Sequence, residues 1–197
     1  MTMEQLWDEF LYYLRVERRS KATLSFYSVT RTKLERYLDS LGGVHEASGV
    51  SVSHLRGFVL WLGEQGLNGG GQHAHVRAVR ALFNWGQREE LLSANPARRL
   101  ALPSLPSQRL LTVTSEVTQR LLGAARTTDQ PLRDAAMVMT LFDTGLRASE
   151  LVKVTVADLE VARGLIRVRG GKGGKDRTVP IGSRALTALA TYQRRER

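Results

Sequence analysis

Two short stretches of the chain combine residue types and spacings that could bind a phosphate. Residues 144–151 read Thr-Gly-Leu-Arg-Ala-Ser-Glu-Leu and follow an apolar run that predicts a buried helix. Gly145 permits the left-handed turn that commonly ends a helix, and Arg147 and Glu150 then share one face of a new helical turn. Because the planar guanidinium of an arginine matches two oxygens of a phosphate, this turn predicts a fixed, anion-binding arginine.

The second stretch has the composition of a β-hairpin with a basic tip. Strand-like runs at residues 165–168 and 177–181 flank a segment that contains four glycines, two lysines and an aspartate. Lys172 and Lys175 would stand on this tip, where a lysine can reach a ligand that the strands cannot touch. The stretch therefore predicts a small antiparallel sheet that presents cations to a ligand.

The two stretches, in this order and at this spacing, resemble two motifs of the tyrosine recombinases, also called phage integrases, and especially of the Xer type. Residues 144–151 are similar to the family's first catalytic box. Residues 171–177, followed by Val-Pro-Ile at 179–181, are similar to its lysine hairpin. The resemblance continues upstream through the first half, so it covers nearly the whole chain.

In that family a tyrosine attacks a DNA phosphodiester and forms a 3′-phosphotyrosyl link, without a metal ion or nucleotide cofactor. The resemblance implies that Arg147 clamps the scissile phosphate and that Glu150 supports the arginine turn. It also implies that Lys172 protonates the leaving 5′-oxygen, while Lys175 and Arg177 contact the DNA. A double glycine ahead of Lys172 is one residue longer than usual, which leaves Lys175 open as the general acid instead.

The family's later boxes, a His-x-x-Arg group, a further His or Trp and the nucleophilic tyrosine, have no match in the sequence. Tyr192 comes too soon after the hairpin and is interpreted as a packing residue on a helix. The sequence therefore predicts a polypeptide that binds duplex DNA and does not cleave it alone. Three origins stay open: a truncated polypeptide, a truncated gene, or a protein that kept binding and lost catalysis.

The charge balance favours a polyanionic partner. The 197 residues include 29 basic and 19 acidic side chains, a net charge of +10. Residues 1–105 hold 13 basic and 10 acidic groups, whereas residues 106–197 hold 16 and 9, so most of the excess accompanies the two motifs. We expect duplex DNA as the partner, with a second recombinase protomer as a further candidate.

Other features exclude several classes of protein. The chain has no cysteine, its four histidines lack metal-ligand spacing, and it shows neither a membrane-spanning apolar run nor a signal pattern. We therefore expect a cytoplasmic protein with no cofactor, no disulfide and no membrane segment. Two other functions compete with a recombinase: a non-catalytic DNA-binding regulator derived from one, and a small helical enzyme unrelated to the family.

The first half predicts a bundle of four amphipathic helices with an aromatic-rich core. The helices cover residues 3–17, Ser20 to about Leu41, a segment that starts at Ser51 or Ser53, and the glycine run 69–71 to near Leu92. Leu41 is expected on a buried face, and His75 is expected to be exposed or to cap the fourth helix. The resemblance makes the second and fourth helices the DNA-facing pair, so the candidate contacts there are Lys21, Arg31, Arg77 and Arg80.

Prolines separate this bundle from the second half. Three of them lie in residues 96–110, which reads as an extended linker. Beyond it, Thr114 or Ser115 should cap a helix that buries Val117, Leu121 and Leu122. The expected fold is therefore mainly α with a small antiparallel β-sheet. It comprises a four-helix SAM-like core-binding domain at 1–95 and, at 111–197, the first part of an α+β catalytic domain.

Overall fold

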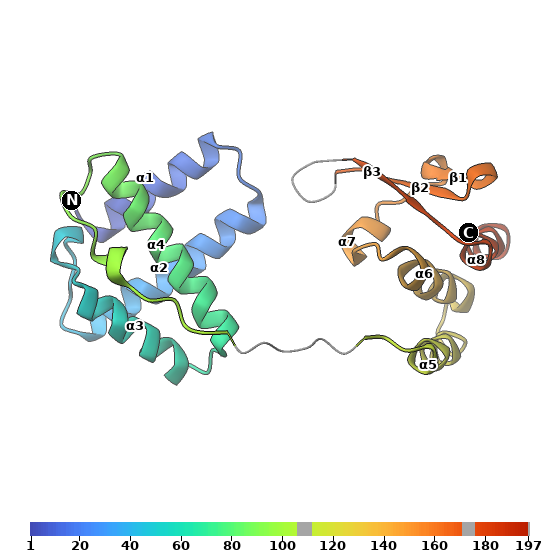
Figure 1. The fold of residues 1–197 in the computed structure, drawn as a ribbon, viewed down its shortest axis with the longest axis horizontal. Helices are drawn as coiled ribbons and strands as arrows, with labels where there is room; N and C mark the ends of the chain where they lie inside the picture. The colour runs from blue at the N-terminus through green and yellow to red at the C-terminus, as the bar shows by residue number, and fades with distance from the viewer. Residues whose placement is uncertain (106–111, 171–175, 197) are drawn as a thin grey trace. The chain divides into compact units, whose positions relative to one another are not determined.

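The computed structural model describes residues 1–105, 112–170 and 176–196, so Lys172 and Lys175 lie outside the described residues. The chain divides into two compact units, Met1–Gln108 (unit 1) and Arg109–Arg197 (unit 2). Figure 1 colours them from blue to green and from yellow to red. The predicted fold class is confirmed, because the described elements are mostly helices with a small antiparallel sheet. None of the described helices is both long and apolar enough to cross a membrane.

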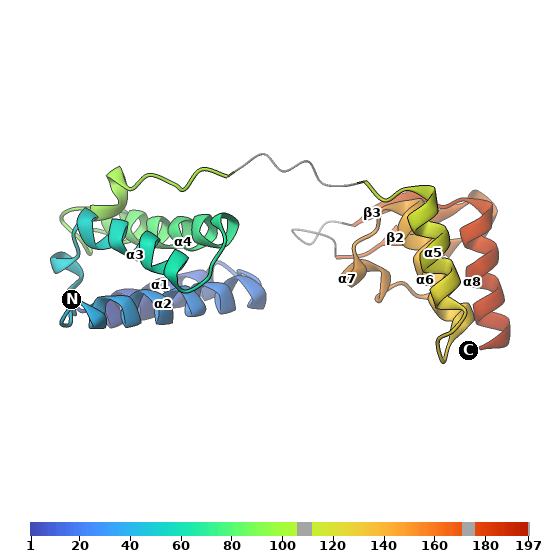
Figure 2. The same ribbon diagram turned by 90° about the horizontal axis from the view of Figure 1, so that it is seen from below.

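The described part of unit 1 is a bundle of four α-helices around one hydrophobic core (Figures 1 and 2). Each helix begins after a side chain that accepts the backbone N–H of the third helical residue, which satisfies one of the unpaired donors at a helix start. The predicted caps Ser20 and Ser51 are confirmed. The helices are α1 (Met3–Val16), α2 (Lys21–Ser40), α3 (Val52–Glu64) and α4 (Gly69–Arg88), with short 3-10 helices η1 (Ala47–Gly49) and η2 (Pro96–Arg99).

Aromatic side chains occupy the centre of this core, as the sequence predicts. Trp7 and Phe83 are fully buried, and the ring of Phe10 meets that of Tyr27 edge-on at a centroid distance of 5.1 Å. Leu41, in contrast, is 48% exposed, so its predicted burial is wrong. It is the C-cap residue of α2, where the chain has already left the helical path that would keep it on the apolar face.

The region after α4 differs from the prediction in two ways. The helix ends at Arg88 rather than near Leu92, because the chain reverses through Glu90, whose φ of 61° is left-handed. Residues 96–99 were expected to be extended, but they form η2, whose residue Ala97 is completely buried in the core of unit 1. Asn95 caps this turn by accepting the N–H of Ala97 at 2.9 Å. The first helical unit therefore continues past residue 95.

A buried polar pair joins α2 to α4. The Nδ1 atom of His75 lies 2.8 Å from Oγ1 of Thr30, and the two residues are 5% and 0% exposed. The imidazole also stacks on Phe26 at a centroid distance of 5.0 Å. The expectation of an exposed or capping His75 is therefore wrong: the residue lies on the core side of α4 and connects the two helices predicted to face DNA.

We expect unit 1 to lose stability as the pH falls below about 6.5, the ordinary pKa of histidine. Burial, and secondarily the charge of Lys33, lowers the pKa of His75 in the folded state. The unfolded chain therefore takes up a proton that the folded chain rejects, so stability rises with pH across this range. Thermal unfolding of wild type and of His75→Gln, followed by circular dichroism at pH 5 and pH 8, measures this. Identical pH dependence in the two proteins would contradict it.

Unit 2 packs helices against one side of a small sheet. The described strands β1 (Leu159–Glu160), β2 (Leu165–Val168) and β3 (Arg177–Pro180) run antiparallel in the order β1-β2-β3. In β2 and β3, Ile166 pairs with Val179 and Val168 with Arg177, which confirms the predicted hairpin. The helices are α5 (Ser115–Ala125), α6 (Pro131–Thr144), the short α7 (Ala148–Leu151) and α8 (Ser183–Arg195), with 3-10 turns η3 (Val156–Asp158) and η4 (Val161–Arg163).

The core of unit 2 lies between α6, α8 and the sheet, centred on Ile166 and Val168. The carboxylate of Glu196, beyond α8, accepts two backbone N–H groups at the start of α6, each at 3.0 Å. The predicted burial of Val117 and Leu121 is wrong, since they are 41% and 48% exposed. Instead, Thr118 and Ala125 are the buried residues of α5. Among the described elements, α5 packs mainly against α6, so only the face of α5 that is turned toward α6 is covered.

Candidate phosphate-binding site and nucleic-acid interface

The end of α6 positions Arg147. Gly145 is the C-cap of that helix with φ of 63° and ψ of 22°, the left-handed conformation that the sequence predicts. Leu146 is then buried against the unit 2 core at 5% exposure. Arg147 follows as the N-cap residue of α7, with its side chain 58% exposed. A buried anchor on one side and a helix start on the other therefore hold an arginine that still faces solvent.

Glu150 is the buried centre of this turn. Its side chain is 6% exposed, yet it receives four hydrogen bonds. Arg147 donates its backbone N–H to Oε2 at 2.9 Å and Nη1 to Oε1 at 3.0 Å. Arg177 donates Nη1 to Oε1 and Nη2 to Oε2, both at 2.8 Å. A carboxylate has about four lone-pair sites, so Glu150 is fully satisfied.

These contacts keep Glu150 ionised. Hydrogen bonds from the Arg177 side chain and then from the Arg147 backbone hold the pKa of Glu150 well below its usual range, although burial acts in the opposite direction. A permanently charged carboxylate fixes one edge of the Arg147 guanidinium. Within the described residues, Nε and Nη2 of Arg147 have no hydrogen-bond partner, so they remain available for an anion.

A second buried carboxylate, Asp158, holds the end of β2 through an ion pair with Arg169. Nε of Arg169 donates to Oδ1 of Asp158 at 2.7 Å, and Asp158 is 3% exposed. The hydroxyl and the N–H of Thr155 donate to Oδ2 of Asp158, and together with Arg169 they lower the pKa of this carboxylate. Across the hairpin, the N–H of Gly170 donates to Oδ1 of Asp176 at 2.8 Å. Both strands are therefore fixed where they approach the tip.

The predicted site residues of unit 2 are partly brought together. Arg147 and Glu150 form one cluster, as expected, whereas Lys172 and Lys175 are outside the described residues. Arg177 was predicted to contact DNA, but it joins the Glu150 cluster through both of its terminal nitrogens. The alternation of side chains along β3 could have predicted that Arg177 points toward the protein, because it lies on the same face of the strand as Val179, which packs on the core.

In unit 1, a shallow groove lies between α2 and α4, the helix pair predicted to face DNA. It has a volume of about 490 Å³ and is lined mainly by small and aromatic residues, with the cation Arg77 on one wall. Lys21 is exposed at the start of α2, beside this groove, and Arg80 is half-buried one turn beyond Arg77. The groove lining is Ala22, Thr23, Phe26, Tyr27, Ala74, Arg77, Ala78 and Ala81.

Arg31 behaves differently from the other predicted DNA contacts. Its side chain is 19% exposed and forms ion pairs with Glu4, Asp8 and Glu35. The pair with Glu35 joins neighbouring turns of α2, and the other two connect α2 to α1. The charge of Arg31 is therefore compensated within unit 1, and its geometry supports helix packing rather than contact with a phosphate.

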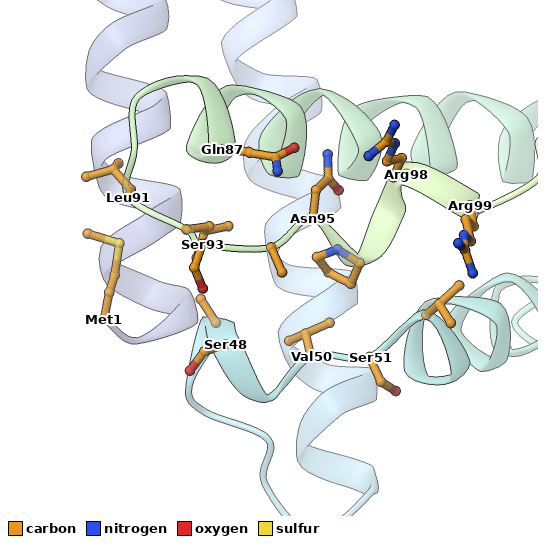
Figure 3. A pocket seen from close by; sticks show the side chains of 15 residues that line it. Met1, Ser48, Val50, Ser51, Gln87, Leu91, Ser93, Asn95, Arg98 and Arg99 are labelled. Atoms are coloured by element: carbon orange, nitrogen blue, oxygen red, sulfur yellow. The ribbon is translucent and has the colours of Figure 1, made fainter.

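A second cleft of unit 1 lies elsewhere. It has a volume of about 810 Å³ between the η1 segment, the start of α3 and the residues that follow α4. Figure 3 shows Met1 and Leu91 at one end of this cleft and Arg98 and Arg99 at the other. None of the predicted site residues is among its lining side chains, so the candidate site does not include it.

Two family models together cover most of the chain. Residues 112–196 match the phage integrase family, and residues 7–90 match the phage integrase N-terminal SAM-like domain. Tyrosine recombinase XerC of Pelotomaculum thermopropionicum is 35% identical over 192 residues, which cover 94% of this chain and 62% of that protein. Tyrosine recombinase XerA of Pyrococcus furiosus is 32% identical over 189 residues, covering 95% and 60%. The chain thus spans about three fifths of the length of these curated relatives.

Solved structures show the same fold. The integrase of the Tn1549 transposon, in complex with a circular intermediate DNA, matches with a TM-score of 0.77 at 19% identity, covering 100% of this chain and 66% of that one. A λ integrase dimer bound to a COC′ core site matches with a TM-score of 0.79 at 15% identity, covering 97% and 54%. At these identities the similarity establishes the fold alone.

Proposed function

Because the chain belongs to the phage integrase family of tyrosine recombinases, we propose that it is the DNA-binding and phosphate-clamping portion of a site-specific recombinase. The observation that carries this proposal is the exposed guanidinium of Arg147 held at 3.0 Å by the buried carboxylate of Glu150. The chain binds duplex DNA, acts in the cytoplasm and assembles on DNA with a second recombinase protomer. It needs no metal ion or nucleotide cofactor.

In this function Arg147 acts on the scissile phosphate. When a tyrosine oxygen attacks phosphorus, negative charge builds on the non-bridging oxygens, and a fixed cation lowers the energy of that state more than the energy of the ground state. Nε and Nη2 of Arg147 face these oxygens while Glu150 holds Nη1. The bond from phosphorus to the 5′-oxygen breaks as the tyrosine–phosphorus bond forms, and Lys172 or Lys175 gives the leaving oxygen its proton.

The α2/α4 groove supplies the DNA contacts of unit 1 in this proposal. Lys21, Arg77 and Arg80 neutralise backbone phosphates along the duplex, and each contact releases condensed counterions. The small alanines of the groove allow close approach of the DNA backbone to the helices. Arg31 is left out of this set because three carboxylates already compensate its charge.

We expect Arg77→Ala and Arg80→Ala each to weaken duplex binding and to reduce the slope of log affinity against log salt by about 0.9. Arg31→Ala removes the same charge and is the matched control; its slope should equal that of wild type. A mobility-shift titration from low to high salt measures all four proteins. If Arg31→Ala lowers the slope while the two α4 variants do not, DNA lies on another face of unit 1.

A further inference from the structure

Arg177 occupies an unusual position for a basic residue in this hairpin. It is the first residue of β3, it pairs with Val168, and its side chain is only 38% exposed. Both terminal nitrogens lie 2.8 Å from the two oxygens of Glu150, 27 residues earlier in the chain. This bidentate geometry is the strongest arrangement of an arginine and a carboxylate, and it joins β3 directly to the Arg147 turn.

We propose that Arg177 is a positioning residue, which fixes and neutralises Glu150 so that Arg147 faces the DNA phosphate with its charge uncompensated. This inference rests on the proposed function of Arg147 and goes beyond it. It replaces the expectation that Arg177 itself contacts DNA, and it gives the hairpin a second role in addition to carrying lysines.

The charges of the cluster explain why two arginines are needed. Glu150 has to be ionised to accept all four N–H groups that Arg147 and Arg177 donate to its two oxygens. Paired with Arg147 alone, this carboxylate would cancel the positive charge that attracts a phosphate. With Arg177 present, the three side chains carry one net positive charge. The most exposed of the three is Arg147, at 58%, so that charge is directed toward solvent.

The geometry also separates the roles of the two arginines. Both terminal nitrogens of Arg177 donate hydrogen bonds to Glu150, whereas in the Arg147 side chain only Nη1 does so. A DNA phosphate that approached Arg177 would compete with Glu150 for its guanidinium. Among the described residues, Arg147 is the other group that pairs with this buried carboxylate, and leaving a buried charge unpaired is costly. Arg177 is therefore held against Glu150, while the Nε–Nη2 edge of Arg147 has no partner in the part of the chain that the structure describes.

The first experiment needs no DNA. We expect Arg177→Ala to speed hydrogen exchange of the Arg147 backbone N–H about tenfold or more, because its acceptor Glu150 loses its fixed position. The matched control is Arg169→Ala, which removes an equal charge from the same hairpin but from the Asp158 pair. It should leave the Arg147 N–H unchanged. Exchange of α8 amides should stay at the wild-type rate in both variants, which distinguishes positioning from general unfolding.

The pH dependence of the NMR shift of the Arg147 N–H provides a second test, because a purely structural role of Arg177 would leave that dependence unchanged. In wild type, the NMR shift of the Arg147 N–H should not titrate near pH 4, because the pKa of Glu150 is far below its usual range. In Arg177→Ala the pKa of Glu150 should rise, because the hydrogen bonds from Arg177 are the largest cause of its depression, so the titration should move to higher pH. Arg177→Lys should restore only part of the wild-type lowering of the Glu150 pKa, since an ammonium cannot make both contacts. A profile identical to wild type in Arg177→Ala would overturn the proposal.

The second experiment is a double-mutant cycle of duplex DNA affinity over a range of salt. If Arg177 acts through Arg147, adding Arg177→Ala to Arg147→Ala should cause no further loss of affinity. An additive loss, with a further drop of about 0.9 in the salt slope, would make Arg177 a phosphate contact and overturn the inference. Failure of the proposed function has a different signature: neither wild type nor any variant would bind duplex DNA, whatever the exchange experiment gives.

Discussion

Arg147→Ala should slow DNA strand cleavage by roughly 10²–10³-fold in a recombinase completed by fusing the later boxes of a Xer relative to this chain. That factor is the scale for losing one preorganised donor to a developing oxyanion. The guanidinium contributes a fixed cation at the non-bridging oxygens, and Glu150 sets its direction through a 3.0 Å contact. Single-turnover cleavage of a nicked suicide substrate, followed on a denaturing gel, measures the rate of covalent adduct formation.

Two variants control this result. Arg147→Lys should recover only part of the rate, because a point charge does not reproduce the two-oxygen contact of a guanidinium. The 197-residue chain alone should give no adduct, since Tyr192 lies on α8 beside an apolar groove that α6 also lines. An adduct from this chain that disappears in Tyr192→Phe would show that the assignment of Tyr192 to packing is wrong.

Replacing the hairpin lysine that acts as general acid should also slow cleavage of the completed enzyme, but through the leaving group. General acid catalysis contributes roughly 10²–10⁴-fold. A substrate in which sulfur replaces the bridging 5′-oxygen needs no proton to leave. It should therefore restore most of the rate lost in Lys172→Ala and little of the rate lost in Arg147→Ala. Parallel single-turnover reactions with the two substrates give both ratios.

The same comparison decides between the two lysines of the tip. If sulfur rescues Lys175→Ala and not Lys172→Ala, the proton donor is Lys175, as the additional glycine in the hairpin allows. If it rescues neither variant, the tip contacts DNA and the proton comes from another group. Lys172 is the donor that the resemblance favours, so selective rescue of Lys172→Ala is the expected outcome.

Local chemistry made much of this fold predictable. Ser20 and Ser51 begin helices because their hydroxyls accept the unpaired N–H groups there, and Gly145 takes the left-handed conformation that ends α6 before the arginine turn. The hairpin follows from alternating strand residues around a glycine-rich segment. Each of these signals lies within a few residues of the structure that it specifies.

The features that the sequence did not indicate are contacts between residues far apart in the chain. Nothing near Arg177 indicates that its partner is Glu150, and nothing near Arg31 indicates that Glu4 and Asp8 on another helix compensate its charge. The family resemblance places both arginines among the expected DNA contacts. Similarly, the apolar residues of α5 predict a buried face, but that face finds no covering element in the described part of unit 2, and Leu121 stays exposed.

The most direct test of the Arg147 assignment is an NMR titration of the arginine side chains of this chain with duplex DNA. The Nε–H signal of Arg147 should shift as DNA is added, because that edge of the guanidinium faces solvent while Glu150 holds Nη1. The Nε–H signal of Arg31, whose charge is compensated within unit 1, should remain in place. Binding that moves other arginines and leaves Arg147 unchanged would contradict the claim that this turn is a phosphate clamp.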